Sequence, residues 1–201
     1  MFSVVMDTSN QYLVVGIYQD GHLLDSIQEL GSKRQSENAI PYLERLLKAH
    51  DLSLRDAQEM IITKGPGSYT GVRVALTVAK TLAAISDVKI KTISSLAAYA
   101  GQQRCISVID ARSQKVFVGR YAHGAPLMEE QLMTLEEFAY FKADYAEYPI
   151  VGQAECVGFE MEPVDLCKNL YELGREAPIE ENPDLLVPSY IKEVEAKKAC
   201  Y

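Results

Sequence analysis

A short polar turn near the start of the chain carries residues that could bind a phosphate group. Asp7, Thr8 and Ser9 follow the apolar run FSVVM, so a carboxylate and two hydroxyls would lie between two strands. Such a turn could hold a phosphate or its metal ion. The simpler interpretation is a tight turn whose Asp and Ser side chains bond to the backbone. The residue types favour the second interpretation and leave the first open.

The stretch GPGSYTG, residues 65–71, is the second candidate for phosphate binding. Its glycines permit backbone angles closed to other residues, and Ser68 could cap a following helix. Free amides at a helix start can also bind an anion. The stretch is not a Walker loop, because no Lys-Ser or Lys-Thr pair follows the second glycine at the required spacing. Capping with close packing is favoured, and an anion site stays open.

Metal and nucleophile chemistry find little support in the sequence. The histidines, His22, His50 and His123, are far apart, and none of the four cysteines forms a CxxC pair. No serine lies in a GxSxG motif and no cysteine has a local catalytic signature. Asp110 and Arg112 could be polar groups at a cleft or a structural salt bridge. We therefore expect no catalytic residue, metal or cofactor.

The composition bears on partners and location. The net charge of −8 opposes tight binding of nucleic acid by the chain alone, because phosphate contacts need a basic surface. No run approaches the roughly 18 apolar residues of a membrane helix. Asp7 also comes too early for the core of a signal peptide. We expect a cytoplasmic protein without membrane contact.

The apolar patterns predict the elements that must position these residues. Strands are expected at residues 2–7, 11–19, 22–30, 59–65 and 88–93, and helices at 36–50, 69–85 and 94–101. A second unit starts near residue 104, with strands at 105–110, 115–121 and 148–152 and helices at 135–145 and 166–174. This order predicts mixed sheets with helices packed on them. The stretches VVMDTSN and SVIDARS are each a strand ending in Asp and a polar turn, which suggests a duplicated fold.

The expected helix at 69–85 has more apolar surface than one contact needs. On a helical wheel, a polar stripe about 100° wide holds Thr70, Arg73, Thr77, Lys80 and Thr81. The remaining arc is about 200° wide, and small residues four apart run along it: Gly71, Ala75, Ala79 and Ala83. Either the first helix covers this arc internally, or both helices build an interface with another chain.

Three motifs together resemble one protein family. VVMDTSN at the start, GPGSYTGVR in the middle and IDARSQKVFVGRY later are similar, in this order, to the TsaB (YeaZ-type) family. Proteins of that family are the noncatalytic dimerisation subunits of the bacterial machinery for tRNA threonylcarbamoyladenosine. The resemblance covers residues 1 to about 121 and the closing PSYIKE, while residues 122–178 carry no matching motif. It implies the actin-like/Hsp70-like (ASKHA) α/β fold, with two subdomains, each a mixed sheet flanked by helices, expected at residues 1–103 and 104–201.

The resemblance also implies the partners. These are the catalytic paralogue TsaD and the ATPase TsaE, with tRNA bound only through the complex and a homodimer expected as an alternative in isolation. Catalytic relatives carry a metal-binding histidine pair in the region of the first helix. Here that region reads KRQSENAIPYLERLL, and Gln35 stands where many TsaB proteins have a histidine. We expect a noncatalytic scaffold in which Asp7, Thr8 and Ser9 are at most a weak remnant of a nucleotide site.

With the resemblance, the interface becomes the preferred interpretation of the long helix. The expected partner-facing residues are Tyr42, Leu46, Gly71, Val72, Ala75, Leu76, Ala79, Lys80 and Ala83. The alternative is an active small ASKHA-fold kinase or nucleotide hydrolase. That activity would need a phosphate loop in each subdomain and a catalytic carboxylate. Both DTSN and DARSQ lack the glycine usual in such loops.

Overall fold

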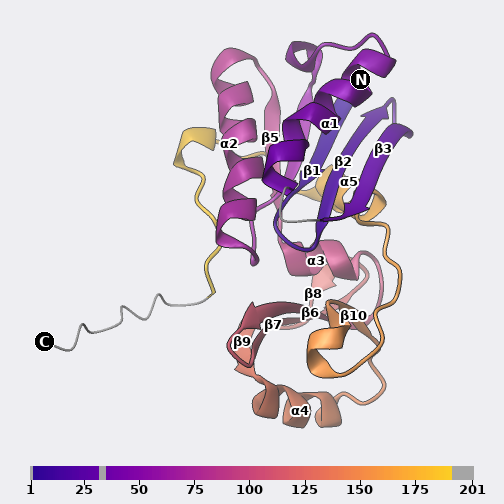
Figure 1. Cartoon of the computed structure of the whole chain (residues 1–201), viewed down its shortest axis with the longest axis vertical. Helices are drawn as coiled ribbons and strands as arrows, with labels where there is room; N and C mark the ends of the chain where they lie inside the picture. The colour runs from indigo at the N-terminus through magenta and orange to yellow at the C-terminus, as the bar shows by residue number, and fades with distance from the viewer. Residues whose placement is uncertain (1, 32–34, 192–201) are drawn as a thin grey trace, which may run out of the picture.

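The computed structural model describes residues 2–31 and 35–191, which form two sheets flanked by helices (Figure 1). The first sheet has the order β3-β2-β1-β4-β5. Its strands are β1 (Phe2–Asp7), β2 (Tyr12–Gln19), β3 (His22–Leu30), β4 (Glu59–Thr63) and β5 (Lys89–Ile93). The first three form an antiparallel meander, and β4 and β5 extend the sheet in parallel with β1. The predicted mixed sheet is confirmed.

Helices cover both faces of this sheet because its strands are apolar on both sides. Along β1, Phe2, Val4 and Met6 enter one core, and Val5 enters the other. Helices α1 (Gln35–Ala49) and α2 (Tyr69–Ile85) pack on the first face. Helices α3 (Ser95–Ala100) and α5 (Leu166–Glu176) pack on the second. The sheet is therefore the middle of three layers.

The second sheet is smaller and has the order β10-β6-β7-β8, with β9 also paired to β7. Its strands are β6 (Cys105–Arg112), β7 (Lys115–Ala122), β8 (Ala125–Pro126), β9 (Gln131–Thr134) and β10 (Ile150–Gly152). Helix α4 (Leu135–Asp144) covers one face, and α3 lies on the other, between the two sheets. Short 3-10 turns complete the fold: η1 (Leu54–Asp56), η2 (Ala154–Val157) and η3 (Pro183–Leu185).

The chain returns to the first sheet after completing the second. Helix α5 contacts β1, β2, β4 and β5, and an isolated bridge then pairs Ile179 with Lys91 of β5. The expected division at residues 103 and 104 therefore separates the two sheets but not their helices. The physical reason is that the second face of the first sheet, with Val5 and Ile61, needs an apolar cover that α5 supplies.

The element boundaries agree closely with the sequence patterns where those patterns are long. The expected bounds of β1, β3 and α2 are those observed, and most others differ by one or two residues. The short strands β8 and β9 were missed, because two- and four-residue strands leave too few positions for a period to show. Within the described residues, no helix combines the length and apolarity of a membrane span.

Candidate functional site

The turn after β1 is closed by hydrogen bonds within the chain. Asp7 Oδ1 accepts a hydrogen bond from the backbone N–H of Ser9 (2.7 Å) and another from the Thr63 hydroxyl (2.6 Å). The parallel register sets Met6 beside Ile62, and therefore Asp7 beside Thr63, at the carboxyl ends of β1 and β4. Asp7 is 1% exposed. Its carboxylate therefore holds two strand ends and the turn together.

The two hydroxyls of the turn are also engaged. The Thr8 hydroxyl donates to the carbonyl oxygen of Gly71 (2.6 Å) and accepts from the backbone N–H of Ala75 (3.3 Å). The Ser9 Oγ lies 2.9 Å from the Ser95 Oγ at the start of α3. Both Thr8 and Ser9 are fully buried. These contacts agree with a turn that bonds to its own surroundings, the simpler of the two interpretations.

The glycine loop packs directly against this turn. The backbone N–H of Ser68 donates to the carbonyl oxygen of Ser9 (2.7 Å). A Cβ atom at Gly67 would overlap that same carbonyl, and one at Gly71 would overlap the carbonyl of Thr8. Ser68 caps α2 by accepting from the Gly71 N–H (3.3 Å). The glycines thus allow the close backbone approach between the loop and the turn.

Burial is the largest influence on the pKa of the Asp7 carboxyl group. Desolvation raises the pKa of Asp7, while the hydrogen bonds from Ser9 and Thr63 act in the opposite direction. A buried carboxyl group with a raised pKa often marks a catalytic acid in a cleft. Here the side chain faces the protein interior instead, so the raised pKa reflects packing.

The other polar candidates from the sequence, Asp110 and Arg112, contact each other within one turn. Asp110 and Arg112 form a turn in which the Arg112 N–H and guanidinium both reach the Asp110 carboxylate, at 2.8 and 3.4 Å. This agrees with the salt-bridge interpretation. Across residues 2–31 and 35–191, no group of three or more His, Cys, Asp or Glu residues could hold a metal ion.

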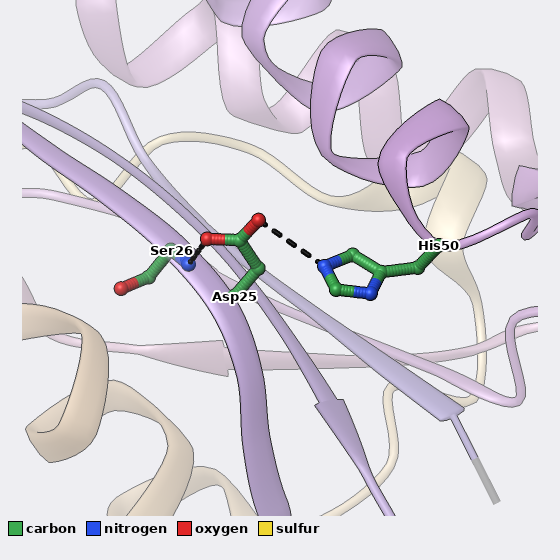
Figure 2. A network of polar contacts seen from close by, with 3 residues as sticks. All are labelled: Asp25, Ser26 and His50. Atoms are coloured by element: carbon green, nitrogen blue, oxygen red, sulfur yellow. Dashed lines mark hydrogen bonds and ion pairs between the residues drawn. The ribbon is translucent and has the colours of Figure 1, made fainter.

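One histidine has a carboxylate partner, at the end of α1. His50 Nε2 lies 3.2 Å from Asp25 Oδ2 on β3, and Asp25 Oδ1 accepts from the Ser26 N–H (Figure 2). Figure 2 shows the Ser26 hydroxyl pointing away from the imidazole, so the three residues do not form a nucleophilic triad. The pair instead ties the C-terminal end of α1 to the edge strand of the sheet.

The cysteines show no reactive environment. Cys105, Cys156 and Cys167 are free thiols, and Cys200 lies outside the described residues. Burial raises the pKa of Cys105 and of Cys167 to about 12 and that of Cys156 to about 11. At neutral pH these groups are thiols, which are poor nucleophiles and poor metal ligands.

Most of the residues expected to face a partner are buried in the core beneath α1 and α2. The buried ones, at 3% exposure or less for those with side chains, are Leu46, Gly71, Val72, Ala75, Leu76 and Ala79. The row of small residues therefore faces the chain's own core, because α1 and the first sheet pack against it. Tyr42, Lys80 and Ala83 remain partly exposed. The expectation that the small-residue row forms the outer surface needs this correction.

A C-terminal segment that the sequence did not place contacts the polar stripe of α2. The Lys80 ammonium donates to the carbonyl oxygen of Asp184 (2.9 Å), and Arg73 Nε donates to the hydroxyl of Tyr190 (3.2 Å). The only sequence signal was the PSYIKE motif, whose last two residues lie outside the described part. Figure 1 shows this segment running along α2. The polar stripe of α2 is therefore partly covered by the chain itself.

Fold and site define a two-sheet α/β protein in which the turn after β1 is closed by hydrogen bonds within the chain. A family model described as "TsaD: tRNA N6-adenosine threonylcarbamoyltransferase" matches residues 27–157, more than half of the chain. The chain belongs to this family and, within it, to the TsaB (YeaZ) type that its motifs resemble.

Individual relatives agree with this assignment. The "tRNA threonylcarbamoyladenosine biosynthesis protein TsaB" of Bacillus subtilis is 33% identical over 135 residues, which are 65% of this chain and 59% of that protein. The protein of the same name from Escherichia coli is 27% identical over 125 residues, 59% and 54% of the two chains. The match thus spans little more than half of these relatives' length.

A solved structure shows the same fold over nearly the whole chain. YeaZ from Pseudomonas aeruginosa superposes with a TM-score of 0.74, covering 94% of this chain and 99% of its own, at 22% identity. The expected ASKHA-type fold is confirmed by this likeness together with the two observed sheets.

Proposed function

We propose that this chain is a noncatalytic subunit of the machinery that forms threonylcarbamoyladenosine on tRNA, and that it works by binding the catalytic paralogue TsaD. The relatives' names support the pathway. The observation that carries the noncatalytic role is the closed turn, in which Asp7, Thr8 and Ser9 are buried and bonded within the chain. A kinase or hydrolase would need these groups free to meet a nucleotide.

The proposed docking surface is the outer side of the α1–α2 layer. It carries apolar side chains that are partly or largely exposed: Ile40, Tyr42, Val74, Val78 and Ile85. Tyr42 is oriented by its hydroxyl bond to Glu29 and by Arg45, whose guanidinium carbon lies 5.0 Å from the ring centroid. A mixed apolar and aromatic surface on two neighbouring helices suits a protein partner. In isolation the same surface would support a homodimer, and TsaE would join the assembled complex.

The rest of the proposal follows from this role. The chain carries a net charge of −8, so tRNA would be held chiefly by the assembled complex. Because the proposed role is in tRNA modification, we expect the chain to act in the cytoplasm. No metal or cofactor is assigned to this chain.

The test is Thr81→Arg, a change at an exposed position of α2 close to Val78 and Ile85 on the helix surface. An arginine there should leave the fold intact and block the approach of TsaD. The matched control is Ala139→Arg at an exposed position of α4, on the second sheet. The measurement is the amount of each variant that co-purifies with TsaD from the same organism. We expect loss for Thr81→Arg and wild-type recovery for Ala139→Arg. Equal recovery of both would place the docking surface elsewhere.

A further inference from the structure

The first sheet ends on one side at β3, whose outer edge is open. Within the residues that the structure describes, β3 pairs with β2 alone. In the same part of the chain, no backbone hydrogen bond other than those to β2 involves residues 22–30. Figure 1 shows β3 as the outermost strand on this side of the sheet. An edge of this kind carries a row of backbone groups without partners.

The opposite edge of the same sheet, at β5, is covered by the chain itself. Ile179 forms a bridge with Lys91, and the Glu180 N–H donates to the carbonyl oxygen of Ile90 (2.9 Å). An extended segment from the C-terminal part thus continues the sheet beyond β5. The fold completes one edge in this way and leaves the other without such a segment.

The ladder shows which backbone groups of β3 point outward. The Gly31 N–H donates to the carbonyl oxygen of Gln11 (2.6 Å), so it points toward β2. Because the direction alternates along an antiparallel strand, the residues whose N–H and C=O groups point outward are Ser26, Gln28 and Leu30. The side chain of Asp25 agrees with this direction, since its Oδ1 accepts from the Ser26 N–H at 2.8 Å (Figure 2).

Little in β3 protects this edge against another strand. The strand is nine residues long and contains neither proline nor lysine, the residues that commonly block edges. Its register shift lies near the hairpin end, before Asp25. The Asp25 carboxylate occupies one outward donor, the Ser26 N–H. Gln28 and Leu30 are exposed, and their outward backbone groups stay open.

We propose that the outer edge of β3 binds an extended peptide segment of another protein by antiparallel strand addition. The complementary structure for alternating N–H and C=O groups along an edge is another extended backbone. Antiparallel pairing is slightly more stable per residue than parallel pairing. The added strand bonds to Gln28 and Leu30, and it displaces the Asp25 carboxylate from the Ser26 N–H. This inference is independent of the proposed function and uses a different surface.

The charges along β3 decide between a second copy of this chain and a different protein. Asp25 and Glu29 share the face toward α1, where they contact His50 and Tyr42. Within the described residues Glu29 has no ion-pair partner and Asp25 has only the histidine. Antiparallel pairing of β3 with its own copy would gather four carboxylates on one face, which is unfavourable. A strand with lysine or arginine at the matching positions is complementary instead.

The probe is a synthetic seven-residue peptide, acetyl-TKTVTKT-amide. In antiparallel register its valine lies opposite Ile27 and its lysines lie opposite Asp25 and Glu29. The backbone control is the same peptide N-methylated at its third and fifth residues, which removes the two N–H groups that would bond to β3. Each lost hydrogen bond contributes about 1 kcal/mol, so this control should bind at least about tenfold more weakly. A peptide with glutamate in place of lysine should bind roughly threefold more weakly or less.

Hydrogen exchange followed by NMR locates the contact on the protein. The Gln28 and Leu30 amides should exchange rapidly in the free chain and become protected with the peptide. The Ile27 and Glu29 amides point toward β2 and should be protected in both states. Leu30→Pro removes an outward N–H without breaking the ladder and should weaken peptide binding about fivefold or more. Leu30→Thr keeps that N–H and is the matched control.

The outcomes decide the proposal without any need for TsaD. Protection of Gln28 and Leu30, together with weaker binding of the N-methylated peptide, supports strand addition at β3. Equal affinity of the two peptides, or no added protection at these amides, would overturn it. The peptide arm uses the wild-type chain, so it holds even if Leu30→Pro disturbs the fold. Sedimentation of the chain alone tests the other occupant: a dimer that Leu30→Pro abolishes and Leu30→Thr retains would overturn the choice of a different protein.

Discussion

At the scale of single residues, Asp7 shows how one side chain can belong to a binding motif and still have a structural role. A carboxylate at a strand end followed by two hydroxyls suggests a phosphate site in sequence. In the structure the Asp7 carboxylate accepts from the Ser9 N–H and the Thr63 hydroxyl, and Thr63 lies 56 residues away in the chain. Sequence could supply the residue types. It could not show that a parallel neighbouring strand would fill the turn with its own hydroxyl.

The buried carboxyl group leads to a prediction about pH. Burial raises the pKa of Asp7 above its ordinary value of 3.8, so the folded state keeps this proton at pH values where the unfolded chain has lost it. The contribution of this group to stability is therefore present below about pH 4 and is lost as the pH rises through the folded-state pKa. An Asp7→Asn variant cannot titrate there, and its amide oxygen can still accept from Ser9 and Thr63.

The measurement is urea unfolding of both proteins between pH 4 and pH 7. The free energy of unfolding of Asp7→Asn relative to wild type should rise with pH, by up to about 1.4 kcal/mol per pH unit until the folded-state pKa is passed. Parallel curves for the two proteins would mean that Asp7 has the same pKa in the folded and unfolded states.

At the scale of elements, helix α2 shows what a periodic pattern can and cannot establish. Its observed bounds are the expected ones, because Ser68 supplies a cap and the apolar period continues to Ile85. The width of the apolar arc correctly indicated more than one neighbour. Which neighbours cover it was beyond the pattern. Helix α1 and the sheet cover the row of small residues, and the segment around Asp184 and Tyr190 contacts the polar stripe.

This assignment predicts opposite results for two arginine substitutions on the same helix. Ala79 is fully buried, so Ala79→Arg would place a charged side chain in a packed core with no partner. The expected cost is at least about 4 kcal/mol of unfolding free energy. Thr81→Arg, at an exposed position two residues further, should change stability by less than about 0.5 kcal/mol. Thermal melting followed by circular dichroism compares them. A stable, fully folded Ala79→Arg protein would show that the row does not belong to the core.

At the scale of the whole molecule, the sequence indicated two sheet-centred units but not how the chain connects them. Strand and helix order predicted the first sheet and its flanking helices. The amphipathic helix near residue 170 was visible, but nothing in its own pattern assigned it to the first sheet rather than the second. The contacts of α5 with β1, β2, β4 and β5 depend on distant strands. The segment of residues 179–191 is similar, because its inward contacts involve few residues and no regular period.

The central claim is that this chain supports catalysis by binding and not by chemistry of its own. Formation of threonylcarbamoyladenosine on tRNA, in a reconstituted system with TsaD, TsaE and the remaining components of the machinery, tests it most directly. We predict that Asp7→Asn, which alters the position where the sequence suggested a remnant of a nucleotide site, leaves product formation at the wild-type level. Thr81→Arg, which alters the proposed docking surface, should abolish it. Loss of product with Asp7→Asn while that variant still assembles with TsaD would contradict the account.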